Sequence, residues 1–184
     1  LSAHQVEYTI LKTYETINGR RTAVNQSNYV LSRLDAGGTD AKDYLERYTY
    51  AYIIGLDSDE PKIAAIIGRS GKNSTFYIDA GDICDDKLSS LSSGRLYYYT
   101  DDDQSRTDYV TIDTADFVYY YNGKKVSGAS IDDLYDAIIG ETTFNDYGIN
   151  GYIELLDNTN NDEYNVIYVT DYLDLVVEST SQSR

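Results

Sequence analysis

Several residue types are scarce in this chain of 184 residues. It contains no tryptophan or methionine, one proline, one cysteine and one histidine. Cys84 has no second cysteine to pair with, so an internal disulfide is excluded. His4 stands at the start of the sequence, so we expect neither a Ser-His-Asp triad nor a histidine-based metal site. The sequence therefore predicts a protein that is not an enzyme.

Basic residues and long apolar runs are scarce as well. Lys and Arg total 15 against 31 Asp and Glu, which gives a formal net charge of -16. The basic residues form no stripe that could displace counterions from phosphates, so no nucleic acid is expected as a partner. No apolar run approaches the length of a membrane helix, so we expect no membrane insertion.

Tyrosine, in contrast, is abundant, with 21 residues against 3 phenylalanines. Its ring favours strands and its hydroxyl tolerates water, which suits antiparallel sheets with one buried face. Asn18-Gly19 and Asn122-Gly123 are hairpin signals, and one helix is predicted over 130–139, capped by Ser130. The predicted fold class is mainly β: an antiparallel barrel or sandwich-like hairpin meanders with one or two short helices.

The chain length fits one β-rich domain or two small ones. We predict an N-terminal β subdomain over 1–90 and a C-terminal β subdomain over 91–184 that contains the helix. The apolar run 62–68 is typical of a strand buried on both faces. Residues 52–58 resemble residues 152–158, and an acidic tip and a returning strand follow each. This likeness favours either an internal repeat or shared hairpin chemistry.

The tip between the predicted strands 152–156 and 164–170 is the candidate metal site. Asp157, Thr159, Asn161 and Glu163 supply alternating oxygen atoms of the kind that Ca²⁺ binds. Asp162 stands where such a loop usually has glycine. The pattern predicts either a degenerate Ca²⁺ loop or an ordinary polar turn, and no other cofactor is expected.

Two tyrosine triplets, 97–99 and 119–121, place rings on both faces of their strands. Tyr98 and Tyr120 are the candidate interaction residues, for subunit contact or for stacking on a glycan. The alternative is that these rings pack in the core and in a wet interface.

One order of motifs runs through much of the chain. A Tyr-rich strand with an acidic tip over 97–103 precedes Tyr-Asn-Gly-Lys at 121–124, a helix, and the segments 151–158 and 164–169. This order resembles β-rich modules of Gram-positive cell-surface proteins that accompany S-layer homology domains. The resemblance covers roughly 48–178. Thr159, Asn161, Asp162 and Asn165 depart from its acidic tip, which weakens the cation binding that the resemblance would imply.

The resemblance implies a non-enzymatic structural module of an extracellular surface assembly, an S-layer or a cell-surface protein stalk. The expected location is the bacterial cell surface, and the expected partners are other copies of the chain or neighbouring surface proteins. Two alternatives stay open: a structural protein of a bacteriophage virion, and a carbohydrate-binding module that uses exposed tyrosines.

Overall fold

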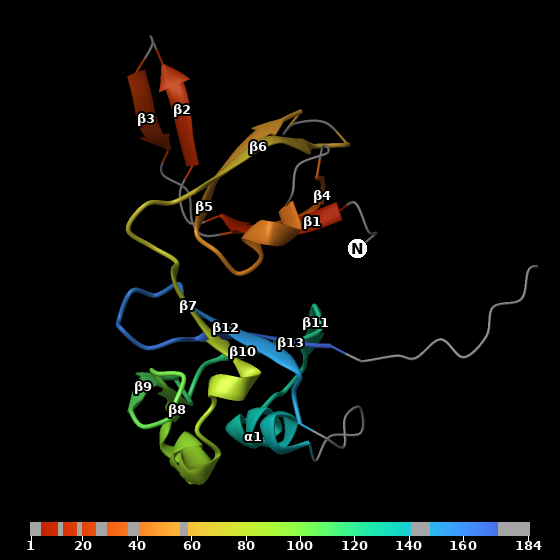
Figure 1. Cartoon of the computed structure of the whole chain (residues 1–184). Helices are drawn as coiled ribbons and strands as arrows, with labels where there is room; N and C mark the ends of the chain where they lie inside the picture. The colour runs from red at the N-terminus through yellow and green to blue at the C-terminus, as the bar shows by residue number, and fades with distance from the viewer. Residues whose placement is uncertain are drawn as a thin grey trace, which may run out of the picture. The chain divides into compact units, whose positions relative to one another are not determined.

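The chain forms two compact units, Leu1–Arg69 and Ser70–Arg184. The computed structural model describes residues 5–10, 13–17, 20–24, 29–36, 41–55, 59–140 and 148–172 (Figure 1). The predicted division between residues 90 and 91 differs from this one. The reason is strand pairing: β7 (Ser74–Asp79) pairs with β12 (Gly151–Asp157), so the segment after residue 70 belongs to the C-terminal sheet.

The fold is mainly β, as the composition and the residue pattern predict. The described strands form open sheets, antiparallel or mixed, in a sandwich-like arrangement rather than a closed barrel. Within the described part of the chain, no helix has the length and apolar character needed to cross a membrane.

The N-terminal unit holds six strands and one short 3-10 helix. Its elements are β1 (Gln5–Ile10), β2 (Thr13–Ile17), β3 (Arg20–Val24), β4 (Tyr29–Asp35), η1 (Ala41–Tyr44), β5 (Thr49–Ile54) and β6 (Lys62–Gly68). One sheet has the order β1-β4-β6-β5, in which β4 and β6 are parallel, and β2 and β3 form a separate hairpin. The predicted Asn18-Gly19 turn lies outside the described residues, but the strands on either side of it pair.

Strand β6 is buried on one face only, which corrects the prediction for the run 62–68. Ile63 is 1% exposed, whereas Ile67 is 52% exposed.

The C-terminal unit holds the larger sheet. Besides β7 and β12 its elements are η2 (Ala80–Asp82), η3 (Asp85–Ser93), β8 (Arg95–Tyr99), β9 (Thr107–Thr111), β10 (Val118–Tyr121), β11 (Lys124–Val126), α1 (Ile131–Ile139) and β13 (Val166–Asp171). The five-stranded sheet has the order β11-β10-β13-β12-β7, and β8 and β9 form a separate hairpin. Strands β10 and β13 are parallel, while the other pairs of this sheet are antiparallel.

Helix α1 forms where the sequence predicts it. Asp133 Oδ2 accepts hydrogen bonds from the backbone N–H of Ser130 at 2.6 Å and from its hydroxyl at 2.8 Å. Gly140 ends the helix in the left-handed conformation, with φ of 86°. Both ends are therefore defined by local signals.

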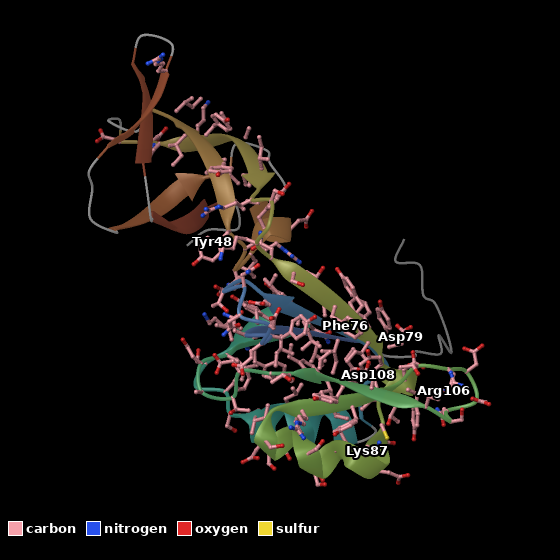
Figure 2. All side chains as sticks on the ribbon, turned by 90° about the vertical axis from the view of Figure 1, so that its left-hand side faces the viewer. Tyr48, Phe76, Asp79, Lys87, Arg106 and Asp108 are labelled. Atoms are coloured by element: carbon pink, nitrogen blue, oxygen red, sulfur yellow. The ribbon has the colours of Figure 1, made fainter. Side chains whose placement is uncertain are left out.

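The larger core cluster lies on one face of the five-stranded sheet, where η3, α1 and the β8-β9 hairpin pack (Figure 1), and a smaller one with Leu156 and Val166 lies on the other face. Strands β12 and β13 contribute alternate residues, among them Ile153 and Ile167, both 0% exposed. Phe76 of β7, labelled in Figure 2, places its ring centroid 5.1 Å from that of Tyr98. Lys87 of η3, also labelled there, donates from Nζ to Thr107 Oγ1 at 2.6 Å and so links η3 to β9.

The two units share one order of elements. Each begins with a strand and a hairpin, continues with a strand and a short helix, and ends with a second hairpin. In each, the strand that follows the first hairpin lies parallel to the last strand: β4 to β6, and β10 to β13. The first strand differs, because β1 pairs with β4 whereas β7 pairs with β12. This common order favours an internal repeat over shared hairpin chemistry alone, with η2, η3 and β11 as additions in the second unit.

Two tyrosines of β10 differ in the hydrogen bonding of their hydroxyl groups. Tyr119 is 3% exposed and its hydroxyl has no hydrogen-bond partner among the described residues. Burial raises the pKa of this phenol above its ordinary value. The hydroxyl of Tyr121 donates to Asp171 Oδ2 at 2.5 Å.

Replacing these tyrosines by phenylalanine should have different effects on stability. We expect Tyr119→Phe to leave the free energy of unfolding unchanged or to raise it by about 1 kcal/mol, because an unsatisfied buried hydroxyl is removed. Tyr121→Phe should lower it by about 1–3 kcal/mol, because the Asp171 carboxylate loses a donor. Urea denaturation followed by circular dichroism measures both. Equal losses in the two variants would show that Tyr119 has a partner as well.

Candidate functional site

The candidate cation loop connects β12 to β13, and Asp157 is its centre. This residue ends β12 and is 4% exposed. Its Oδ1 accepts hydrogen bonds from the backbone N–H of Asn160 at 2.6 Å and from the Thr159 hydroxyl at 3.0 Å. Its Oδ2 accepts one from the backbone N–H of Asp162 at 3.1 Å. One buried carboxylate thus holds the loop in shape.

Asn161 forms a second acceptor in the same loop. Its Oδ1 lies 2.8 Å from the Thr159 hydroxyl oxygen and accepts the backbone N–H of Glu163 at 3.1 Å. The structure therefore brings Asp157, Thr159 and Asn161 into one hydrogen-bonded group. Glu163 joins through its backbone, and its side chain is exposed.

The base of the loop is closed by a pair of asparagines. Asn165 Oδ1 accepts the backbone N–H of Asn158 at 3.1 Å, and Asn165 Nδ2 donates to Asn158 Oδ1 at 2.8 Å. At the tip, Asn160 and Asp162 have φ of 62° and 66°. The chain thus makes its left-handed turns here with Asn and Asp, which tolerate this conformation better than other side chains with a Cβ.

Calcium binding by Asp157, Thr159, Asn161 and Glu163 was one of two alternatives for this loop, and an ordinary polar turn was the other. Two of the four carry carboxylates, and the Asp157 carboxylate already accepts three hydrogen bonds. Across the described residues, no group of three or more His, Cys, Asp or Glu is arranged to hold a metal ion. The observed geometry is that of a turn closed by its own donors.

Other acidic turns of the C-terminal unit are built in the same way. Asp101 accepts the backbone N–H groups of Ser105 and Arg106 at 2.9 and 3.0 Å, and the Ser105 hydroxyl at 2.7 Å. The hydrogen bond from that hydroxyl is the main reason that the pKa of Asp101 lies below its ordinary value. Asp113 accepts the backbone N–H groups of Ala115 and Asp116.

Asp171, at the end of β13, joins three parts of the sheet. Besides the Tyr121 hydroxyl, its carboxylate accepts the backbone N–H of Asn150 at 2.7 Å, just before β12. Its own backbone N–H donates to Asn122 Oδ1 at 2.8 Å, in the turn between β10 and β11. This residue is 8% exposed, so the network lies in the interior.

The two candidate interaction tyrosines do not offer exposed rings. Tyr120 is 5% exposed and stacks on Tyr168, with the ring centroids 5.2 Å apart. Tyr98 packs against the core beside Phe76, and burial is the main reason that its pKa is raised. The triplets do put rings on both faces of each strand, but both faces are largely covered at these positions.

Other tyrosines carry the exposed aromatic surface, and none of them is among the candidate residues predicted from the sequence. Tyr52 and Tyr77 are each 59% exposed, and Tyr172 is 55% exposed. On β5 the signal was present in the sequence, because large side chains at positions 50, 52 and 54 alternate with those directed inward. Tyr77, Tyr152 and Tyr172 form a row with centroid spacings of 6.2 and 6.4 Å, but the rings are tilted by 53° and 58°.

Comparison with protein-family models, with curated proteins and with solved structures finds no match to this chain. The functional interpretation therefore rests on the residues of the chain itself.

Removal of the Asp157 carboxylate should destabilise the C-terminal unit. We expect Asp157→Ala to lower the free energy of unfolding by about 2–3 kcal/mol, because the N–H groups of the loop lose their charged, buried acceptor. The matched control is Glu163→Gln, an exposed change in the same loop, which should stay within about 0.5 kcal/mol of the original chain. Urea denaturation measures both. An equal effect of the two changes would show that the charge of the loop matters rather than its hydrogen bonds.

Calcium should have little effect on this loop. Because the Asp157 oxygens are already used as acceptors, we expect the melting temperature to stay constant up to millimolar Ca²⁺, with no binding heat in calorimetry. A rise in melting temperature that disappears in Asp157→Asn would instead show that the ion is coordinated there.

Proposed function

We propose that this chain is a non-enzymatic structural module of an extracellular surface assembly, such as an S-layer or the stalk of a bacterial cell-surface protein. The observation that supports it best is the use of the acidic side chains. Asp101, Asp113, Asp157 and Asp171 each accept hydrogen bonds from nearby backbone N–H groups. A carboxylate in this role maintains the shape of a turn, as a rigid spacer requires.

The arrangement in two units supports the same proposal. Both units repeat one order of elements, and each builds its own sheet. A stalk or a surface layer gains length and area by placing such units in succession, because each unit packs its own core. In the C-terminal unit, fully buried side chains such as Leu155 and Val166 give that sheet its stiffness.

The two alternatives have less support. A carbohydrate-binding module needs exposed rings that can lie flat against a sugar, whereas Tyr120 is buried and the exposed row around Tyr152 is strongly tilted. A role in a bacteriophage virion would use the same sheet packing, and no particular observation favours it.

Electron microscopy tests the proposal. We expect the purified chain to form ordered filaments or sheets as its concentration rises, and to bind no sugar on a glycan array. Binding of a defined glycan, lost in Tyr77→Ala or Tyr172→Ala and not accompanied by any assembly, would replace the proposal by sugar recognition.

A further inference from the structure

Three tyrosines lie side by side across one face of the C-terminal sheet: Tyr77 on β7, Tyr152 on β12 and Tyr172 just after β13. Asp79 and Thr170 stand opposite Tyr152 in the register, and each of the other two tyrosines is two residues away along its strand. Aromatic side chains still reach each other at this diagonal spacing. We refer to the three residues as the tyrosine row.

The rings of the tyrosine row are close enough to meet by side-chain motion alone. The ring centroid of Tyr152 lies 6.2 Å from that of Tyr77 and 6.4 Å from that of Tyr172. Tyr77 and Tyr172 are exposed, so they change rotamer quickly, and a dissolved oxidant reaches them. Two phenol rings joined through the carbons beside their hydroxyl groups are twisted rather than coplanar. The observed tilts, which disfavour stacking on a sugar, therefore do not oppose such a bond.

The composition directs oxidation to tyrosine. Methionine and exposed cysteine thiolates are the side chains that oxidants commonly modify. This chain has no methionine and no tryptophan, and Cys84 is 3% exposed. The same lone cysteine excludes an internal disulfide, so a bond between two tyrosines is a covalent cross-link that remains open to the chain.

We propose that the tyrosine row is an oxidative cross-linking site, at which Tyr152 becomes bonded to Tyr77 or to Tyr172. The co-substrate is hydrogen peroxide, used by a haem peroxidase. Each of the two phenols gives up one electron and its hydroxyl proton, and peroxide takes both electrons and both protons to become two water molecules. The two phenoxyl radicals then form a carbon–carbon bond between the ring carbons beside their oxygens. Each of these carbons loses its hydrogen as a proton and each oxygen regains one, so the product is two joined phenols.

The other tyrosine pairs are less suited to this reaction. Tyr97 and Tyr109 have their centroids 5.2 Å apart, but Lys87 Nζ lies 4.7 Å from the Tyr97 ring and Arg95 Cζ lies 5.2 Å from the Tyr109 ring. A cation over a ring stabilises the electron-rich ring and so opposes loss of an electron. In the stacked pair on β10 and β13, Tyr120 is 5% exposed, which keeps a dissolved oxidant away.

A bond to Tyr77 would join β7 to β12, two strands far apart in the sequence. A cross-link between distant positions stabilises a fold by restricting the unfolded chain, and more so for a longer loop. The inference rests on the proposed function for its setting, because extracellular surfaces are oxidising. The reaction itself needs no assembly, so it can be tested separately.

Oxidation of the purified full chain tests the proposal. The chain is kept dilute at low ionic strength, with a haem peroxidase and hydrogen peroxide as the oxidant. We expect dityrosine fluorescence in the monomer fraction, because repulsion between copies of net charge -16 disfavours coupling between chains. Trypsin and a glutamate-specific protease place the three tyrosines on separate peptides, so mass spectrometry identifies the bonded pair by its loss of two hydrogen atoms.

Substitutions by phenylalanine keep the ring and remove the reactive hydroxyl. Tyr152→Phe should lose both cross-linked products, because this residue is common to them. Tyr77→Phe should retain only the bond to Tyr172, and Tyr172→Phe only the bond to Tyr77. The matched control is Tyr109→Phe, which removes another exposed tyrosine and should leave the product unchanged. Circular dichroism verifies that each variant is folded.

The outcomes separate this inference from the proposed function. Bonded peptides from the tyrosine row, lost in Tyr152→Phe and kept in Tyr109→Phe, support the inference. Absence of dityrosine, a bond mapped to the Tyr97 pair instead, or coupling only between chains overturns it. Equal fluorescence in folded Tyr152→Phe overturns it as well. None of these results concerns filaments or sheets, which electron microscopy of the unoxidised chain decides separately.

Discussion

The hydrogen bond between a side-chain oxygen and the backbone of its own turn is the interaction on which the C-terminal unit depends. A sheet built of hairpins exposes many backbone N–H groups at its turns, and each costs free energy when it is buried without a partner. Asp157 and Asp101 serve three donors each, and Asp171 connects three segments of the sheet. Charge-assisted bonds of this kind are the stronger ones. The acidic composition is thus part of the architecture as well as of the surface.

Local signals made part of the fold predictable. Helix 130–139 has its cap, its capping-box acid and its terminal glycine within ten or so residues, and the structure contains it. The Asn122-Gly123 turn is likewise predicted by two adjacent residues. Their φ angles are 47° and 75°, and a type I′ hairpin turn requires positive φ at both positions. The parallel pairs β4-β6 and β10-β13 left no comparable signal, because they join strands far apart in the sequence. For the same reason the chain divides near residue 70 and not at 90.

For the candidate cation loop, the sequence predicts which residues come together better than it predicts what they bind. The alternation at 157–163 correctly gathers Asp157, Thr159 and Asn161 into one group, because alternating oxygens in a short loop point toward its centre. Whether those oxygens face a cation or the N–H groups of the loop depends on backbone geometry, which the residue types alone do not define. The tyrosine triplets show a related limit. Strand alternation assigns Tyr98 and Tyr120 to a face, but elements distant in sequence decide which faces are covered.

The shared order of elements suggests how two similar units acquire different surfaces. In the second unit the first strand lies beside β12, whereas in the first unit it lies beside β4 and leaves β5 at the end of the sheet. Natural sheets usually protect a strand in that position with charges, proline or a bulge. The β5-β6 hairpin has a register shift of the bulge type between Tyr52 and Ile53, but β5 contains neither a charged residue nor proline. The protection comes instead from the charge of the other unit, because residues 70–184 hold nearly all of the net charge of -16. Repulsion between copies slows their approach at low ionic strength and weakens as salt screens it.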